Sequence, residues 1–442
     1  MVSKQQLCNS LFHKMSRATM AALTMAVTFA LAVVLTPSAQ AQTLTVLHNF
    51  TGGGDGANPQ TGLTIDAAGN LYGTTWAGGG SKCGNWGTCG GVAGCGTVFK
   101  LKHSGSGWVL NTLYGFTGSS DGACPWTKPA LAKDGTLYGT TWAGGGNCSQ
   151  PVYGCGTVFQ LRPSPAAPKT ALAPWSETVI HAFTGTPDGQ NPEGDLTFDP
   201  SGNIYGTTFG GGNQGYGCAG CGAVYKLTLS GGGWTETVLY SPPGDGTEGA
   251  FPVGGVVFDK SSNLYGVFSE GDQSGTHWGT VYELSPSGSG WVEQMLYAFT
   301  NGDDGSDPSS VIIDSAGNLY GTTAAGAGTV FELTPGNGGW TFTTLYHIFH
   351  AGENPEGPLD RLLMDAAGNL YGTTLKDYEY GTVFKLAPSN GGWTYTQLYA
   401  FTGGSDGKYP YGGVVMDANG NLYGTTSAGG AYGNGVVWEL TP

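Results

Sequence analysis

Short hydrophobic runs separated by glycine, asparagine and aspartate recur along the chain in a fixed internal order. Asn-Leu-Tyr-Gly-Thr-Thr, or a near variant, occurs seven times, with its tyrosine at Tyr72, Tyr138, Tyr205, Tyr265, Tyr320, Tyr371 and Tyr423. An apolar run ending in Asp-x-x-Gly precedes most copies, and variants of Gly-Thr-Val-Phe-x-Leu and then Gly-Trp-x-x-x-x-Leu-Tyr-x-Phe follow. Short runs rich in β-branched and aromatic residues, bounded by turn formers, predict strands. Four such strands in each unit of 51–67 residues predict an all-β, seven-bladed β-propeller with four antiparallel strands per blade.

The two ends of the chain supply two parts of one repeat unit. The last unit stops after its third predicted strand, Gly435–Leu440. Residues 43–50 fit the fourth-strand pattern, with Phe50 at the phenylalanine position. We therefore expect the N-terminal strand to complete the last blade, which closes the ring and protects its sheet edges.

Loop lengths distinguish the two faces of the predicted ring. The hairpins between strands one and two and between strands three and four are short and share one face. The loops between strands two and three and the connections between blades share the other face, and the loops of the first three units are long. Because binding sites favour variable loops on a rigid scaffold, we expect a site on this loop-rich face of blades 1–3.

Three consecutive motifs carry a family resemblance. Leu-Tyr-Gly-Thr-Thr, then Gly-Thr-Val-Phe-x-Leu, then Leu-Tyr-x-Phe-x-Gly-x-x-Asp-Gly-x-x-Pro resemble the GloVer tandem repeat of exported bacterial proteins, many of which end in a surface-anchoring tail. The resemblance covers residues 43–442 and implies export but no particular activity. This chain ends at Thr441-Pro442 without such a tail, so release or periplasmic retention is expected rather than anchoring.

The first 41 residues have the pattern of an export signal. Lys4, Lys14 and Arg17 accompany an apolar run from about Met20 to Leu35, and Ala39-Gln40-Ala41 forms a small-residue cleavage pattern. We expect cleavage before Gln42. A membrane anchor is the alternative, but the uninterrupted run is short for a span. Residues 42–442 are then a single propeller domain, extracellular or periplasmic, without a further membrane span.

Composition excludes several classes of protein. Glycine supplies 81 of 442 residues without a Gly-X-Y period, which excludes collagen and disfavours a helical fold. The net charge is −15, and only two arginines follow residue 41. Nucleic acids and anionic membranes require a basic surface, so neither is expected as a partner. We expect a monomer.

Eight cysteines remain after signal cleavage, and seven of them lie in the loops between strands two and three of the first three units. An even number in an exported chain indicates disulfides. The simplest pairing is Cys83–Cys95, Cys89–Cys124, Cys148–Cys155 and Cys218–Cys221, although sequence does not fix connectivity. A redox role for Cys218-Ala-Gly-Cys221 is disfavoured, because no predicted helix N-terminus would lower a thiol pKa there.

Aromatic residues in the same loops are the candidate ligand-binding residues, because aromatic rings can stack on sugar faces. Trp86, Tyr153 and Tyr216 lie outside the repeat pattern and are the better candidates. Trp76, Trp142 and Phe209 share one repeat position, which favours packing beneath the loops over ligand binding.

The recurring aspartates fit two roles, as calcium ligands or as turn formers. Asp-Gly-x-x-Pro, reduced to Asp-Gly at Asp245, holds Asp55, Asp121, Asp188, Asp245, Asp304 and Asp406, and the short hairpins hold a second series that includes Asp66 and Asp417. Recurrence in nearly every unit favours turns over calcium, and no other metal or cofactor is expected. His48 and His181 occupy tyrosine positions, which favours a structural role. Residues that break the repeat, such as Glu270, Asp360 and Arg361, are alternative functional pointers.

Three functions remain open. The first is a non-catalytic binding or scaffold propeller for extracellular polysaccharide, or for another envelope protein. The second is a secreted lyase or hydrolase that acts on glycans or lactones at the channel mouth. The third is a purely structural envelope protein without a ligand. A cluster of carboxylates with a histidine at the channel mouth would favour the enzyme, whereas an aromatic groove would favour the binder. The fold is compatible with both; no catalytic residue is predicted, and the non-enzymatic function is favoured.

Overall fold

The structure is a computed structural model. It describes residues 42–442 except 81–82, 84–87, 90, 106, 147, 149–153, 164–174, 215–217, 219, 244–247, 272–277, 289, 349–360 and 376–378. The expected export signal, residues 1–41, lies outside the described residues. The chain divides into two units, Met1–Thr43 with Pro442, and Leu44–Thr441. Among the described residues, no helix is long and apolar enough to span a membrane.

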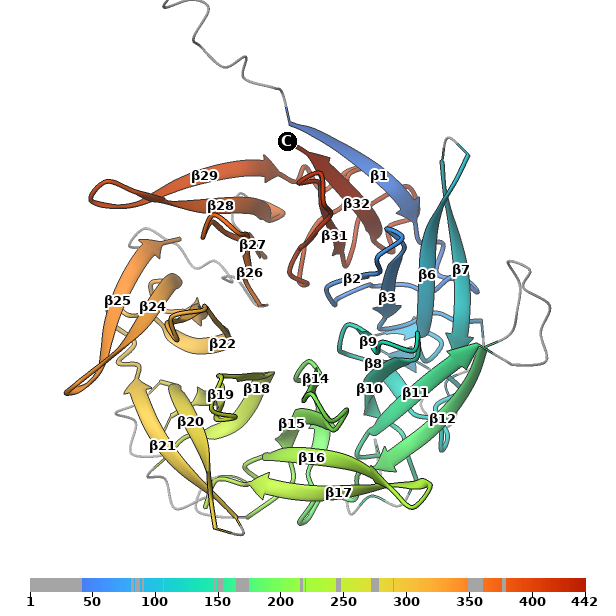
Figure 1. The fold of residues 1–442 in the computed structure, drawn as a ribbon. Coiled ribbons are helices and arrows are strands. Elements are labelled where there is room, and N and C mark those ends of the chain that lie inside the picture. Colours follow the sequence, from blue (N-terminus) through green and yellow to red (C-terminus); the bar gives the residue numbers. More distant parts are fainter. Residues whose placement is uncertain are drawn as a thin grey trace, which may run out of the picture. The chain divides into compact units, whose positions relative to one another are not determined.

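Seven antiparallel sheets form the blades of the predicted propeller (Figure 1). Blade 1 comprises β2 (Thr64–Ile65), β3 (Leu71–Thr75), β6 (Thr97–Ser104) and β7 (Gly107–Gly115). Blade 2 comprises β8 (Ala123–Pro125), β9 (Ala130–Leu131), β10 (Leu137–Ala143), β11 (Thr157–Pro163) and β12 (Trp175–Ala182). Blade 3 comprises β13 (Gln190–Pro192), β14 (Thr197–Phe198), β15 (Ile204–Gly210), β16 (Ala223–Ser230) and β17 (Gly233–Tyr240). Blades 4 to 7 comprise β18 (Ala250–Phe258), β19 (Leu264–Glu270), β20 (Thr280–Ser287) and β21 (Gly290–Ala298); β22 (Ser306–Ile313), β23 (Leu319–Ala325), β24 (Thr329–Gly336) and β25 (Gly339–His347); β26 (Leu363–Met364), β27 (Leu370–Thr374), β28 (Thr382–Ser389) and β29 (Gly392–Ala400); and β30 (Val415–Met416), β31 (Leu422–Thr426), β32 (Val436–Thr441) and β1 (Thr43–Asn49). The short β4 (Thr88–Cys89) and β5 (Val92–Ala93) pair in a loop of blade 1.

The N-terminal strand closes the ring as predicted. β1 is the outer strand of the sheet β1-β32-β31-β30, so the last blade joins both ends of the propeller (Figure 1). Phe50, directly after β1, is fully buried and belongs to a hydrophobic cluster with Leu71 and Phe99 of blade 1. Ring closure therefore depends on side-chain packing as well as on strand pairing.

Hydrophobic clusters fill the seams between neighbouring blades, each drawing residues from two blades. At most seams, the buried phenylalanine after strand four meets an aromatic ring of strand three in the next blade. Ring centroids are 5.1 Å apart for Phe116 and Phe159, and 5.3 Å apart for Phe299 and Phe331. The repeated Leu-Tyr-x-Phe and Gly-Thr-Val-Phe motifs are thus partners across seams, in the edge-to-face geometry that aromatic pairs prefer.

A backbone contact fixes each described connection between blades, the one between blades 5 and 6 lying outside the described residues. The residue before the proline of Asp-Gly-x-x-Pro has a positive φ, as in Asn191 at 54°. Its N–H donates to a carbonyl of the preceding blade, in this case that of Cys155 at 2.8 Å. The next residue, Pro192, packs against Gly156, where an added Cβ would lie 2.6 Å from the proline Cδ. Glycine is therefore required at the start of Gly-Thr-Val.

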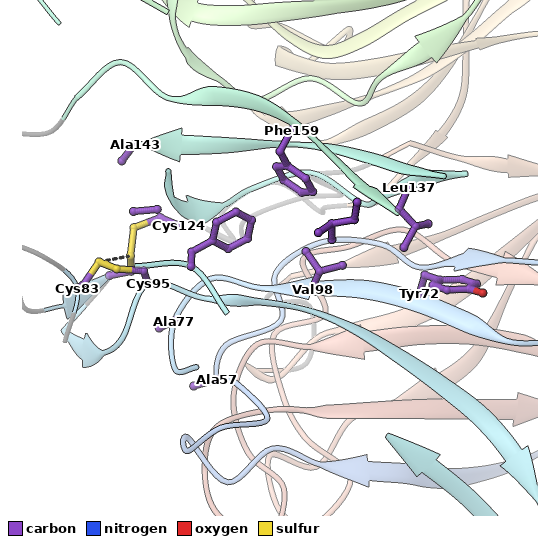
Figure 2. Close-up of a cluster of buried hydrophobic side chains, with 14 residues drawn as sticks. Ala57, Tyr72, Ala77, Cys83, Cys95, Val98, Cys124, Leu137, Ala143 and Phe159 are labelled. Atoms are coloured by element: carbon purple, nitrogen blue, oxygen red, sulfur yellow. Dashed lines mark hydrogen bonds between the residues drawn. A yellow bond between two sulfur atoms is a disulfide. The ribbon is translucent and has the colours of Figure 1, made fainter. Parts of the chain in front are cut away.

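The cysteines of blade 1 anchor its long loop to the core between blades 1 and 2. The structure contains the four disulfides that form the simplest pairing, Cys83–Cys95, Cys89–Cys124, Cys148–Cys155 and Cys218–Cys221. Figure 2 shows Cys83, Cys95 and Cys124 at one end of a buried cluster whose other end holds Tyr72 and Leu137. Cys89–Cys124 joins the loop of blade 1 to the connection that enters blade 2.

Three glutamates occupy the seams beside blades 2 to 4. Glu177, Glu236 and Glu293 each lie two residues after the strand-four tryptophan, where blades 5 and 6 have Phe342 and Tyr395. Phe342 stacks on Tyr297 of the preceding blade, at 4.2 Å between ring centroids. Burial raises the pKa of each of these glutamates to about 7. The nearby charge of Asp121 adds to the effect at Glu177, and that of Glu248 adds to it at Glu293.

These glutamates predict a stability that falls as pH rises from 5 to 8. Their pKa values in the folded state lie above the ordinary value of 4.5, which applies in the unfolded chain. Their favourable contribution to the free energy of unfolding is therefore complete below about pH 4.5 and is lost as pH rises through about 7. The hairpin aspartates Asp66 and Asp417, whose pKa values hydrogen bonds lower from 3.8 against the opposing effect of burial, titrate below this range. Thermal unfolding between pH 5 and 8 measures the slope.

A triple variant in which glutamine replaces Glu177, Glu236 and Glu293 tests whether these residues cause the pH dependence. We expect the fall in melting temperature between pH 5 and 8 to become clearly shallower. Asp303→Asn, at an exposed position, is the control and should keep the wild-type slope. An unchanged slope in the triple variant would mean that other groups cause the pH dependence.

Candidate functional site

A cavity of about 260 Å³ lies where the inner segments of six blades converge. Its walls come from connections between blades, from β18 and β22, and from the ends of β15, β19 and β23. These segments belong to the loop-rich face on which a site was expected. Because blades 1, 2, 3, 4, 5 and 7 all contribute, the cavity is centred on the propeller axis, and we call it the axial pocket.

One repeat position supplies most of the variable side chains of the axial pocket. It is the residue directly after the proline of Asp-Gly-x-x-Pro, represented in the lining by Gln60, Trp126, Glu193, Val253, Ser309 and Tyr411. The contact between the preceding proline and the glycine of Gly-Thr-Val recurs among the described connections, whereas the six side chains that follow the proline in the lining all differ. A rigid backbone with changing side chains is the arrangement of a binding site.

The polar wall of the axial pocket is charged. Lys128 Nζ lies 2.7 Å from Asp195 Oδ2 in a salt bridge between blades 2 and 3. Trp142 Nε1 donates to Glu193 Oε1 at 2.9 Å. Burial raises the pKa of Glu193 to about 7 despite this hydrogen bond. Asp307, a further lining residue, is more exposed, and desolvation together with the charge of Glu270 raises its pKa to about 6.

Aromatic rings form the other part of the lining. Trp126, Phe209 and Tyr411 line the axial pocket. Trp126 lies edge-to-face against Trp76, with ring centroids 4.7 Å apart. Phe209 stacks on Phe251 at 4.7 Å. Neighbouring rings therefore hold two of the three aromatic side chains in place.

The ligand-binding candidates from the sequence fall into two groups. Trp86, Tyr153 and Tyr216 lie outside the described residues. Trp76 and Trp142 do not line the axial pocket but support it, because Trp76 packs on Trp126 and Trp142 donates to Glu193. Phe209, from the same repeat position, lines the pocket directly.

Sequence reasoning missed the charged and polar lining residues. Gln60, Trp126, Lys128, Glu193, Asp195 and Asp307 were not among the candidates. A signal existed for Gln60, Trp126 and Glu193, since one position after an otherwise constant proline carries a different residue in almost every unit. The convergence of that position on the axis depends on the closed ring.

Arg361, a repeat-breaking residue, reaches beyond the blade next to it. Its Nη2 donates to the carbonyl oxygen of Gly254 at 3.2 Å, which links the inner edge of blade 6 to that of blade 4. Gly254 lines the axial pocket, so this arginine supports its wall. Asp360 lies outside the described residues.

The recurring aspartates satisfy turns and seams. Asp121 accepts hydrogen bonds from the Thr117 N–H at 2.8 Å and from the Tyr114 hydroxyl at 3.1 Å. His48 and His181 replace that tyrosine and contact Asp55 and Asp188 at 3.1 and 3.2 Å. Among the described residues, no group of three or more His, Cys, Asp or Glu side chains could hold a metal ion.

Comparisons with known proteins agree with this architecture. The Gloeobacter/Verrucomicrobia repeat, a family of repeat proteins, matches residues 29–217, 148–326 and 276–442. No curated protein matches the sequence significantly.

Solved structures with similar folds include a fungal alcohol oxidase of the AA5 family in complex with copper, which has 14% identity over 91% of this chain and 77% of its own, with a TM-score of 0.55. A putative 6-phosphogluconolactonase from Bacteroides fragilis has 15% identity over 82% and 87%, with a TM-score of 0.49. A second, from Bacteroides uniformis, has 14% identity over 77% and 84%, with a TM-score of 0.48. At these identities, the likeness to the oxidase shows the propeller fold alone.

Proposed function

The chain belongs to the Gloeobacter/Verrucomicrobia repeat family, and we propose that its propeller binds sugar units of extracellular polysaccharide in the axial pocket without altering them. The observation that carries the proposal is one cavity that combines Trp126, Phe209 and Tyr411 with the polar groups of Gln60 and Asp195. Aromatic rings pack against the C–H faces of a sugar, while amide and carboxylate oxygens accept hydrogen bonds from its hydroxyls.

The size of the axial pocket limits the ligand. Its volume of about 260 Å³ lies just below the roughly 300–1,000 Å³ of pockets for drug-sized ligands. One sugar ring at a time suits this volume. The rest of the polysaccharide then lies outside the pocket.

Binding of extracellular polysaccharide also requires that the protein is exported. A polysaccharide outside the cell is accessible only to an exported protein, and four disulfides suit an oxidising compartment. The pattern of residues 1–41 supports the same location.

Removing the axial tryptophan should abolish most of the binding. We expect Trp126→Ala to weaken affinity for a bound monosaccharide by about tenfold or more, because central aromatic residues dominate binding energies. Calorimetric titration of residues 42–442 with a panel of monosaccharides, supported by affinity electrophoresis with polysaccharides, measures the loss.

Two other tryptophans provide the controls. Trp278 is 47% exposed and does not line the pocket, so Trp278→Ala should bind as the wild type does. Trp86→Ala tests the loops. If binding were lost in Trp86→Ala and retained in Trp126→Ala, the ligand would bind the loops instead of the axial pocket.

A glycan hydrolase or lyase is the second candidate, favoured by one observation. The axial pocket holds Glu193, whose pKa burial raises to about 7, beside Asp195, whose charge Lys128 neutralises. A carboxylic acid that keeps its proton near neutral pH, beside a second carboxylate, is a combination used for general acid–base catalysis. New reducing or unsaturated ends in the same samples, absent in Glu193→Gln, would favour this enzyme over the binding protein.

A further inference from the structure

We propose that the axial pocket selects a sugar that carries a free, protonated amine over its neutral and N-acetylated counterparts. The inference rests on the proposed function, because it names the class of sugar that the same pocket prefers. It follows from the charges, the unsatisfied acceptor and the aromatic walls of the pocket.

The charged lining of the axial pocket contains more carboxyl groups than cations. Glu193, Asp195 and Asp307 face a single ammonium group, that of Lys128. Lys128 pairs with Asp195 at 2.7 Å. Within the described part of the chain, neither Glu193 nor Asp307 forms a salt bridge. Arg361, the other cation beside the wall, donates to the carbonyl oxygen of Gly254. Among the described residues, two acidic groups of the lining therefore have no salt bridge.

The surroundings make those two acidic groups costly to ionise. Burial raises the pKa of half-buried Glu193 to about 7. Asp307 is more exposed, and desolvation together with the charge of Glu270 raises its pKa to about 6. A buried carboxylate becomes favourable when a cation and hydrogen-bond donors reach it. An ammonium group in the ligand supplies both, whereas a hydroxyl or an N-acetyl group supplies no charge.

A buried amide oxygen in the wall of the axial pocket independently favours a ligand that donates hydrogen bonds. Gln60 Oε1 is buried and, within the described part of the chain, accepts no hydrogen bond. Gln60 lines the same cavity. A buried amide oxygen without a donor is costly, and an ammonium group has three N–H donors to offer.

The aromatic walls favour an organic cation. Trp126, Phe209 and Tyr411 line the pocket, and the faces of such rings attract ammonium groups. A bare metal ion fits less well, since no described group of three or more His, Cys, Asp or Glu side chains could hold one. The carbon ring of an amino sugar can pack against the aromatic side chains while its amine faces the acids.

The test compares glucosamine, N-acetylglucosamine and glucose as calorimetric titrants of residues 42–442 at about pH 6. We expect glucosamine to bind at least about tenfold more tightly than the other two, since hydrogen bonds between charged groups are stronger than neutral ones. In Glu193→Gln with Asp307→Asn, the ratio of glucosamine affinity to glucose affinity should fall to about one, whatever happens to the affinity for glucose itself. Asp303→Asn, an exposed acid outside the pocket lining, should keep the preference.

Proton release gives a readout that a general loss of structure would not reproduce. Binding of the amine should displace protons from Glu193 and Asp307, so the heat of binding should depend on the ionisation heat of the buffer. Glucose should show no such dependence. If glucose and glucosamine bind equally, the amine inference is overturned and the proposed function stands. If none of the three sugars binds, the proposed function itself fails.

Discussion

Phe50→Ala should lower the free energy of unfolding of residues 42–442 by about 3–5 kcal/mol, as large-to-small substitutions of buried aromatic residues do. Phe50 is fully buried, and its ring centroid lies 5.3 Å from that of Phe99 in blade 1. The substitution leaves a cavity in the seam where the last blade meets the first. Denaturant titration measures the change.

A substitution within β1 separates this effect from strand pairing. Thr45 lies in β1 and is exposed, so Thr45→Ala should change stability by no more than about 0.5 kcal/mol. A loss below about 1 kcal/mol in Phe50→Ala would contradict a seam held closed by this side chain.

Replacing both Cys89 and Cys124 by serine should lower stability by about 4 kcal/mol. Their disulfide spans 35 residues and joins the loop of blade 1 to the connection that enters blade 2. In the chain-entropy model, a cross-link that closes a longer loop restricts the unfolded chain more strongly. Thermal and denaturant unfolding without reductant measures the loss.

The Cys218–Cys221 disulfide is the matched control, because its sequence separation is only 3. Its removal should lower stability by about 2 kcal/mol on the same model. Equal losses in the two double variants would show that loop length does not determine the contribution of these disulfides.

The repeat made the fold predictable from the sequence. Seven copies of one strand pattern determine the number of blades, and the incomplete last unit identifies β1 as its missing strand. The same comparison between units placed His48 and His181 at tyrosine positions, where each contacts the aspartate of its blade connection. Local pattern sufficed because each of these features depends on residues within one unit or on its position in the series.

The axial pocket could not be predicted from any single unit. Glu193 and Asp307 lie in different blades, and their approach to one cavity depends on the closed ring. The raised pKa of Glu193 arises from burial at that convergence. The sequence candidates Trp86, Tyr153 and Tyr216 belong to the long loops, whereas the lining comes mainly from the short segments that enter the blades.

A crystal structure of residues 42–442 with a bound monosaccharide would show directly whether the axial pocket is the binding site. We predict that one sugar ring lies against Trp126, with its polar groups toward Glu193 and Asp195. A sugar bound only at the loops that carry Trp86, Tyr153 and Tyr216, with the axial pocket free of sugar at saturating concentration, would contradict the proposal.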